Sequence, residues 1–248
     1  MLKTYLDDIR VALSLLTRLP IRVPTDAYQR SHKAVWAYGA AGAVWAICVW
    51  AVSTLAMTFG LSTLIAAGLG LTMGVVVTGA MHEDGLADCA DGFWGGWEPE
   101  RRLDIMRDSR LGVYGSLALI LSTLLRWNLI ATILADANSL LALMLAGMFA
   151  RATLPVIMSR LPHARSTGLS HSVGRPSGRS VYISFGFTAL IGLVFMGASG
   201  LMIAFIAAFA GGLCARLAQK KIGGQTGDVL GASAVITEIS VLIAFILF

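Results

Sequence analysis

Three aspartates with helical spacing are the residues of this chain best suited to chemistry. Asp84, Asp88 and Asp91 directly follow a long apolar run. On a helix, the spacing i, i+4, i+7 puts three carboxylates on one face, where like charges repel one another. At a membrane boundary these charges are also costly to desolvate. A hard divalent cation would remove the conflict, so we predict a Mg²⁺ or Mn²⁺ site that holds a phosphate or diphosphate.

Two neighbouring groups extend this candidate site. His82 precedes the aspartates as a candidate metal ligand, catalytic acid or base, or packing residue, whereas Glu83 is expected to face elsewhere on the helix. The motif Arg107-Asp108-Ser109-Arg110-Leu111-Gly112 follows at the predicted start of the next long helix. Guanidinium forks match phosphate oxygens, and a helix N-terminus favours an anion. We predict phosphate binding there, with ordinary positive flanking of a membrane span as the alternative.

A third motif is rich in glycine, namely Gly223-Gly224-Gln225-Thr226-Gly227-Asp228-Val229-Leu230-Gly231. We predict a flexible loop in which Gly224, Thr226 and Gly227 turn toward phosphate and Asp228 supplies a carboxylate. The Gly-Lys-Ser/Thr ending of a Walker loop is absent. Glu238 lies farther on inside an apolar run, and an intramembrane carboxylate is a candidate for function. Its partner would be Arg126 or Arg151, in either a substrate contact or a structural ion pair.

The composition is that of an integral membrane protein. Of the 248 residues, 56% are hydrophobic and 13% are charged, against about 25% charged in soluble domains. We predict an all-α polytopic bundle of about seven transmembrane helices that follows an N-terminal amphipathic helix. The predicted spans are 34–58, 61–81, 112–134, 139–159, 181–199, 200–216 and 232–248. The two runs that meet at Ala198-Ser199-Gly200 form either a hairpin or one long broken helix.

The distribution of positive charge predicts the orientation. Of 19 Lys and Arg, all but Arg126 and Arg151 fall before the first span or in alternate connections. The positive-inside rule then puts the N-terminus and the acidic motif in the cytoplasm. It also accounts for the net charge of +5, so no nucleic-acid partner is expected. Cys48, Cys89 and Cys214 form no CxxC pair and are expected to be packing residues.

The chain thus divides into one membrane domain, 1–248, with four polar segments. These are a cytoplasmic amphipathic segment 1–33, an acidic metal and phosphate loop 82–111, a basic cytoplasmic loop 160–180 and a glycine-rich loop 217–231. The chemistry is expected to face the cytoplasm, where nucleotides and Mg²⁺ are available.

Several of these motifs resemble one known family. The block Gly79–Gly92 resembles the signature of cobalamin synthase (adenosylcobinamide-GDP ribazoletransferase, cobalamin 5′-phosphate synthase). Leu16-Thr17-Arg18-Leu19-Pro20, the segment Arg107–Gly112 and the segment Gly223–Ala232 with Glu238 resemble the same family in the same order. The segment Ser166–His171 departs from the Gly-Leu-Gly expected there, which leaves the role of that loop open.

The resemblance implies an enzyme of the bacterial inner membrane that acts late in cobalamin biosynthesis. A ribose hydroxyl of α-ribazole, or of its 5′-phosphate, would attack the cobinamide-side phosphate of adenosylcobinamide-GDP and release GMP. Mg²⁺ on Asp84, Asp88 and Asp91 would bridge the diphosphate. Arg107 and Arg110 would hold phosphate oxygens. Either Asp228 or one of the acidic cluster would accept the hydroxyl proton. Docking of other corrinoid-assembly enzymes and formation of an oligomer are left open.

Two other classes are considered. A CDP-alcohol phosphotransferase also carries helix-borne aspartates, but here Asp84-Gly85-Leu86-Ala87 is followed by Asp88 where that pattern has Arg, and its second half is missing. An ion-coupled transporter would use intramembrane charges such as Arg126 and Glu238 as an ion path. Against this class, the acids cluster at one face of the membrane and no inverted repeat is evident.

Overall fold

The protein is a bundle of helices, as the sequence predicts. The computed structural model describes residues 2–176 and 178–248. Its elements are α1 (Leu2–Leu16), η1 (Thr25–Arg30), α2 (Ser31–Ala34), η2 (Val35–Ala37), α3 (Tyr38–Thr58), α4 (Thr63–Thr78), α5 (Met81–Gly95), α6 (Pro99–Ile105), α7 (Val113–Ile133), α8 (Ser139–Ala152), α9 (Leu154–Arg160), α10 (Leu169–Val173), α11 (Arg179–Met196), α12 (Ala198–Ile222) and α13 (Gly227–Leu247). Within the described residues, strand-like pairing is limited to one bridge between His163 and Gln225.

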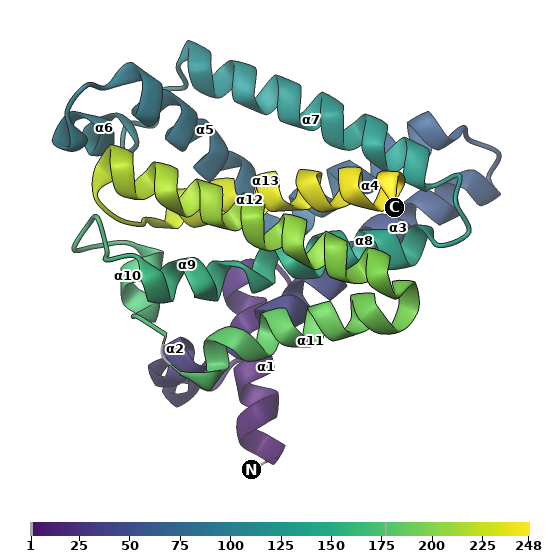
Figure 1. The fold of residues 1–248 in the computed structure, drawn as a ribbon, viewed down its shortest axis with the longest axis horizontal. Coiled ribbons are helices and arrows are strands. Elements are labelled where there is room, and N and C mark those ends of the chain that lie inside the picture. The colour runs from purple at the N-terminus through teal and green to yellow at the C-terminus, as the bar shows by residue number, and fades with distance from the viewer. Residues whose placement is uncertain (1, 177) are drawn as a thin grey trace.

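The long helices run side by side (Figure 1). In the described part of the chain, six helical stretches are long and apolar enough to cross a membrane: Thr25–Thr58, Val113–Ile133, Ser139–Arg160, Arg179–Met196, Ala198–Ile222 and Gly227–Leu247. The pair α4 and α5 passes the same test together, although it is bent by 86°. By length and composition the protein is therefore a multi-pass membrane protein with six candidate spans, or seven if the bent pair is counted as one span.

The bend between α4 and α5 comes from two residues in the left-handed region. Gly79 has φ 65° and Ala80 has φ 58°, and Ala80 is the one described residue other than glycine with positive φ. A Cβ at Gly79 would meet the side chain of Arg18, whose backbone N–H donates to the carbonyl of Val77 at 2.7 Å. Such strained backbone persists only where its surroundings fix it. The Leu16–Pro20 segment supplies those surroundings and so sets the direction of α5.

The two ends of the bundle differ in chemistry. One end holds α6, α10 and the loops that flank them, and we call it the polar end (Figure 1). The corners between α3 and α4, between α7 and α8 and between α11 and α12 lie at the opposite end with the C-terminus (Figure 1). These corners are the connections that the sequence leaves free of Lys and Arg. The structure thus gathers the basic connections on one side, as the charge pattern predicts.

The structure corrects the boundaries in the last third of the chain. The span predicted for 200–216 continues to Ile222, and the span predicted for 232–248 begins at Gly227. The expected flexible loop 223–231 is therefore only residues 223–226. The reason is local, because the Thr226 hydroxyl accepts the N–H of Val229 at 3.3 Å and so caps α13. Similarly, the expected acidic loop 82–111 consists largely of α5 and α6.

The runs 181–199 and 200–216 form a hairpin. α11 ends at Met196, and α12 begins at Ala198 after Gly197, which has φ 58°. A Cβ at Gly200 would collide with the backbone of Gly192. The absence of side chains at these two positions lets the helices approach closely.

The bundle has an enclosed centre and an apolar outer face. Most residues of α8 and many of α13 are buried, among them Phe149 and Leu242. α7, α11 and α12 instead expose large apolar side chains such as Leu121, Phe187 and Phe209. An apolar surface of this extent marks contact with lipid.

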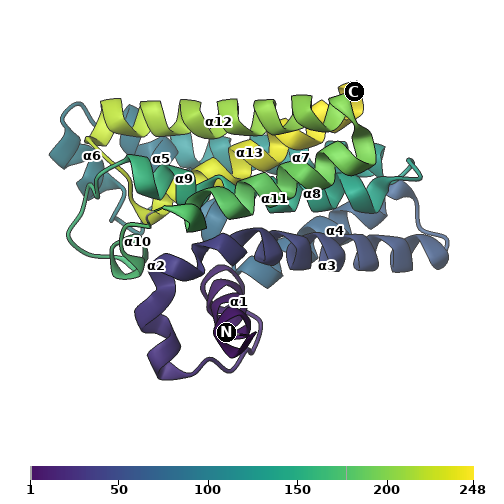
Figure 2. The same ribbon diagram turned by 60° about the horizontal axis from the view of Figure 1, so that its bottom comes forward.

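The N-terminal amphipathic helix is confirmed. α1 projects from the bundle at a steep angle to the long helices (Figure 2). It buries Val11 and Leu16. Asp8 accepts a hydrogen bond from the indole N–H of Trp36 at 3.0 Å and pairs with Arg30 at 3.5 Å. α1 is thereby fixed to the segment that leads into α3.

The contact that positions the acidic motif is the crossing of α5 over α13. A Cβ at Gly85 would lie 2.6 Å from the carbonyl oxygen of Asp228 and 2.9 Å from its Cα. A Cβ at Gly231 would lie 3.0 Å from the carbonyl oxygen of Met81. With glycine at both positions, the two backbones touch. Asp84 and Asp88 consequently lie beside Asp228, which is 140 residues or more away in sequence.

This crossing predicts a sharp difference between two glycine substitutions. Gly85→Ala places a methyl group against the backbone of Asp228, which cannot move aside by changing a side-chain rotamer. We therefore expect a loss of about 1–3 kcal/mol of stability. Gly186→Ala is the matched control, since its Cβ would meet nothing within 4 Å. Thermal unfolding of the purified protein in detergent measures both. Equal melting temperatures for the two variants would contradict a close α5–α13 crossing.

Candidate functional site

A cavity of about 210 Å³ lies at the polar end, where segments far apart in sequence meet. α5 contributes His82 and Asp84, and the start of α13 contributes Thr226, Gly227 and Asp228. Met81 of α5 and Leu230 and Gly231 of α13 also line it. The remaining walls come from α1, α3, α9 and the basic loop; they are Leu15, Leu16, Tyr38, Leu154, Met158, Arg165, Thr167, Gly168, Leu169, Ser170 and Val173. The cavity thus unites the acidic motif, the glycine-rich motif and the N-terminal motif of the sequence.

The carboxylates around this cavity are held close to one another. Asp84 is exposed and lines the cavity, whereas Asp88 is half-buried and lies next to the cavity without lining it. The negative charges of Asp228 and Asp84 repel the carboxylate of Asp88, and the positive charge of Arg165 offsets part of this repulsion. Three carboxylates therefore share one region with a single nearby arginine. Such an excess of negative charge favours a cation.

Arg165 is the cation that the sequence analysis did not single out. Its guanidinium donates to an Asp228 oxygen at 2.9 Å and to the carbonyl of Leu103 at 3.1 Å. The Thr226 hydroxyl also donates to Asp228, at 3.3 Å. Arg165 links the basic loop to α6 and to α13. No spacing rule marks this residue, because its partners lie more than sixty positions away on each side.

The donor set around the cavity fits a magnesium ion bound jointly by protein and substrate. In residues 2–176 and 178–248, no group of three or more His, Cys, Asp or Glu side chains is arranged so that it could hold a metal ion by itself. Magnesium commonly uses one or two carboxylates and takes its remaining ligands from substrate phosphates and water. Asp84 and Asp88, with Asp228 beside them, supply that chemistry. The metal-binding role of these residues stays a prediction.

Asp91 has a different environment from Asp84 and Asp88. It is buried, and its two oxygens accept the backbone N–H groups of Gly112 at 2.8 Å and Gly115 at 2.9 Å. These groups belong to the first turn of α7, so Asp91 caps that helix from a neighbouring one. A Cβ at Gly112 or at Gly115 would collide with this carboxylate. The structure gives Asp91 a positional role, and its predicted role as a metal ligand stays a prediction.

The predicted phosphate-binding motif lies between α6 and α7 and does not line the cavity. Arg110 forms a bidentate pair with Asp108. This hydrogen bond lowers the pKa of Asp108, whose carboxylate remains in its charged form. Arg107 and Ser109 are exposed. The motif reaches α5 through Gly112, whose backbone N–H donates to Asp91.

The basic loop and the glycine-rich segment are joined by backbone pairing. The N–H of Gln225 donates to Pro162 at 2.8 Å, and the N–H of Ala164 donates back to Gln225 at 2.9 Å. Gly224 lies so close to the Pro162 carbonyl that a Cβ would collide with it. Gly224 thus has a packing role in the structure, and its substrate contact stays a prediction.

The buried amide of Gln225 organises the same corner. Its oxygen accepts the hydroxyl of Ser170, and its nitrogen contacts Nδ1 of His163 at 2.8 Å. Partial burial and the neighbouring His171 and Arg175 lower the pKa of His163. Its neutral ring is therefore favoured at pH 7 and can accept from the amide. The sequence analysis left the role of segment 166–171 open, and the structure places Thr167, Gly168, Leu169 and Ser170 on the cavity wall.

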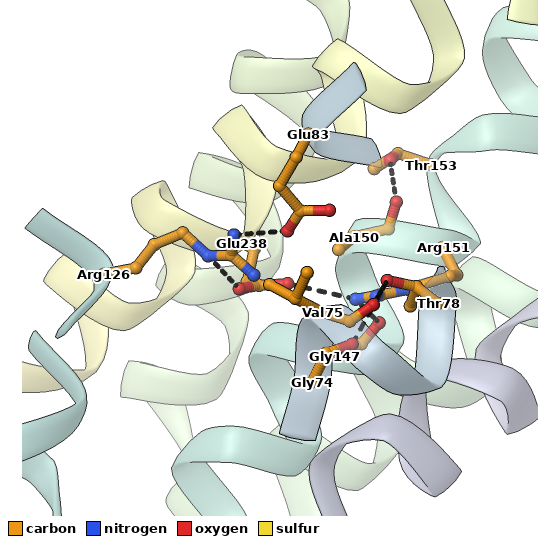
Figure 3. A network of polar contacts seen from close by, with 10 residues as sticks. All are labelled: Gly74, Val75, Thr78, Glu83, Arg126, Gly147, Ala150, Arg151, Thr153 and Glu238. Carbon is orange, nitrogen blue, oxygen red and sulfur yellow. Dashed lines mark hydrogen bonds and ion pairs between the residues drawn. The ribbon is translucent and has the colours of Figure 1, made fainter. Parts of the chain in front are cut away.

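A buried network of four charges joins α5, α7, α8 and α13 (Figure 3). Arg126 of α7 donates to Glu238 at 2.8 Å and to Glu83 at 2.6 Å. Arg151 of α8 donates to the other oxygen of Glu238 at 3.1 Å. The guanidinium of Arg151 also lies 5.0 Å from the ring centroid of Trp45. Both alternatives considered for the partner of Glu238 are therefore present, and the predicted contact of Glu238 with substrate stays untested.

This network ties the first turn of α5 to three spans. Glu83, which the sequence analysis expected to point away from the aspartates, does so and reaches Arg126. His82 is buried on the cavity wall, and its Nε2 has no hydrogen-bond partner among the described residues. A buried, unpaired ring nitrogen beside a cavity suits a group that meets a ligand. The catalytic role of His82 remains a prediction.

Comparison with known proteins identifies the same family that the motifs around the cavity resemble. A family model described as cobalamin-5-phosphate synthase matches residues 8–246. This chain belongs to the cobalamin-5-phosphate synthase family. The match covers the acidic motif, the basic loop and the glycine-rich segment alike.

Relatives of this family member match over nearly their whole length. A protein of Bradyrhizobium diazoefficiens named adenosylcobinamide-GDP ribazoletransferase is 43% identical, covering 98% of this chain and 94% of its own. A protein of the same name from Mesorhizobium japonicum is 41% identical, and the match covers 97% of this chain and 93% of that protein. No solved structure gives a significant match. These relatives give no support to the CDP-alcohol phosphotransferase or transporter alternatives.

The cap made by Asp91 in this family member predicts a loss of stability on its removal. Asp91→Ala leaves two backbone N–H groups of α7 without acceptors, so we expect a loss of about 1–3 kcal/mol. Asp91→Asn keeps one acceptor oxygen, so its stability should lie between that of the wild type and that of Asp91→Ala. Thermal unfolding in detergent measures the series, with exposed Asp104→Asn as the matched control. Wild-type stability of Asp91→Ala would exclude the capping role.

The buried charge network predicts a larger effect. Glu238→Gln removes the charge between two arginines and leaves them mutually repelling in a low-dielectric interior, so a loss of about 3–5 kcal/mol is expected. The exposed Glu100→Gln is the control. A double-mutant cycle with Arg151→Gln should reveal coupling, because the second change removes the unpaired charge. If the stability losses of the two single variants simply added up in the double variant, the proposed coupling between Glu238 and Arg151 would be wrong.

Proposed function

We propose that this protein transfers the cobinamide-phosphate group of adenosylcobinamide-GDP to α-ribazole or its 5′-phosphate. The observation that carries the proposal is one cavity in which three of the four family motifs, the N-terminal, acidic and glycine-rich ones, meet beside Asp84, Asp228 and Arg165. Membership of the family over nearly the whole chain supports the choice of substrates.

The reaction is a phosphoryl transfer with a balanced exchange of bonds. A ribose hydroxyl oxygen forms a bond to the cobinamide-side phosphorus, and the bond from that phosphorus to the bridging oxygen of GMP breaks. The hydroxyl proton passes to a base, and GMP leaves as the anion. Phosphoryl transfer depends on positioning and charge neutralisation more than on covalent catalysis.

The residues in and around the cavity divide these tasks. Asp84 and Asp88 would hold Mg²⁺, which when bound neutralises and orients the diphosphate. Arg165 lies where its guanidinium can meet a phosphate oxygen once Asp228 is engaged elsewhere. Asp228 or a member of the acidic cluster accepts the hydroxyl proton. Arg107 and Arg110 are proposed to contact phosphate from outside the cavity.

The size of the cavity bears on how the substrate binds. About 210 Å³ is less than the roughly 300–1,000 Å³ of pockets that enclose a drug-sized ligand. The cavity therefore suits the reacting groups, and the corrin ring would lie outside. Asp84 lines this cavity and is exposed.

The polar end is proposed to face the cytoplasm from the bacterial inner membrane. Its basic connections support this orientation by the positive-inside rule. GTP-derived substrates and Mg²⁺ are present on that side. The exposed cations of this end leave room for docking of other corrinoid-assembly enzymes and for an oligomer.

The reaction can be tested directly with purified full-length protein in detergent. GMP release is measured from adenosylcobinamide-GDP with and without α-ribazole, and with Mg²⁺ or a chelator. Release that requires both α-ribazole and metal is the expected result. Folded protein that releases no GMP, or that releases it without an acceptor, would overturn the proposed transfer.

The proposed metal ligands give the sharpest variants. Asp84→Asn and Asp88→Asn keep the side-chain size but remove the charge, so we expect turnover to fall by about a hundredfold or more, the scale of one preorganised electrostatic contact. Asp104→Asn on α6 is the matched control and should keep wild-type turnover. Full turnover by Asp84→Asn and Asp88→Asn would exclude their role in holding the metal.

A further inference from the structure

A second hollow lies on the outer face of the bundle, away from the catalytic cavity. It is a groove of about 780 Å³ between α9, α11 and α12. Its floor is apolar and includes Ile157, Phe185 and Ala208. None of its lining residues belongs to the cavity described above. The groove therefore needs an explanation of its own.

Glycine keeps this groove open. Gly186 of α11 and Gly212 of α12 both line it, and a Cβ at either position would meet no atom within 4 Å. The groove thus stays unfilled by the protein's own side chains. In a membrane such a furrow is occupied by lipid, because an empty apolar space loses its packing contacts.

The rim of the groove at the polar end is strongly basic. Arg160 at the end of α9 and Arg216 and Lys220 near the end of α12 line it. None of these three cations forms an ion pair with a carboxylate in the described part of the chain. Cations near helix C-termini are common, but here three of them surround one hollow. They form a site for an anion at the level where the apolar spans end.

We propose that this groove binds one anionic phospholipid. The phosphate lies among Arg160, Arg216 and Lys220, and an acyl chain lies along the apolar floor. From Lys220 to Ala208 the floor follows α12 for about 18 Å, at 1.5 Å per residue. This length suits much of an acyl chain, and Tyr182 on the rim is typical of the headgroup region. Basic pockets between spans are a recognised mode of binding anionic headgroups.

The three cations together with the apolar floor favour an anionic phospholipid over a soluble phosphate or a zwitterionic lipid. A soluble phosphate needs no apolar floor, and a zwitterionic lipid brings a positive group toward three cations. Phosphatidylglycerol satisfies both parts of the groove. It would also fix the hairpin of α11 and α12 against α9, which leads into the basic loop beside the catalytic cavity.

The test compares lipid binding by the full-length protein and matched variants. Delipidated protein in detergent is titrated with phosphatidylglycerol or phosphatidylcholine, and the bound lipid is counted by native mass spectrometry. Wild-type protein should retain one phosphatidylglycerol and much less phosphatidylcholine. The variant R160Q/R216Q/K220Q should bind phosphatidylglycerol about a hundredfold more weakly, at about fivefold per cation.

Two further variants keep the proposal open to refutation. R22Q/K33Q/R101Q removes three exposed cations that do not line the groove, and it should bind as the wild type does. Gly212→Leu fills the groove without changing charge and should also lose the lipid. Equal binding by the two triple variants, equal binding of the two lipids, or retention by Gly212→Leu would each overturn the proposal.

Discussion

The crossing of α5 over α13 is the constraint on which the arrangement of the candidate site depends. Gly85 and Gly231 let the two backbones touch, and a side chain at either position would force them apart. Because α5 carries Asp84 and α13 carries Asp228, this contact alone decides that the two carboxylates share a cavity. Close backbone approach through small residues is a general means of helix association in membranes.

The buried charges hold this crossing in register. Glu83 and Glu238 belong to the two helices that cross, and both accept from Arg126 of a third helix. Arg151 closes the network from α8. Four charges with mutual hydrogen bonds tolerate burial, whereas any one of them alone would not. The first turn of α5 is therefore anchored on one side, while Asp84 and Asp88 remain free on the other.

One corner of the cavity is formed by the basic loop and the glycine-rich segment, which are joined by hydrogen bonds. Gln225 pairs by backbone with the basic loop and by side chain with Ser170 and His163. Arg165 then reaches from that loop to Asp228. Thr226, Asp228 and Arg165 thus belong to a corner that several hydrogen bonds hold together. This arrangement agrees with a reaction that relies on positioning.

The sequence by itself determined the membrane class, the approximate number of spans, the clustering of the basic connections and the resemblance to the family, because hydropathy and charge act locally along a chain. The bend between α4 and α5 came only from the structure. It also marked Asp84, Asp88 and Asp91 as one acidic group and Asp228 as a further candidate carboxylate. Only the tertiary structure decided that Asp91 caps α7, that α13 begins at Gly227 and that Arg165 joins the site. Those outcomes depend on contacts between helices, and no local spacing encodes which distant backbone will lie within hydrogen-bond distance.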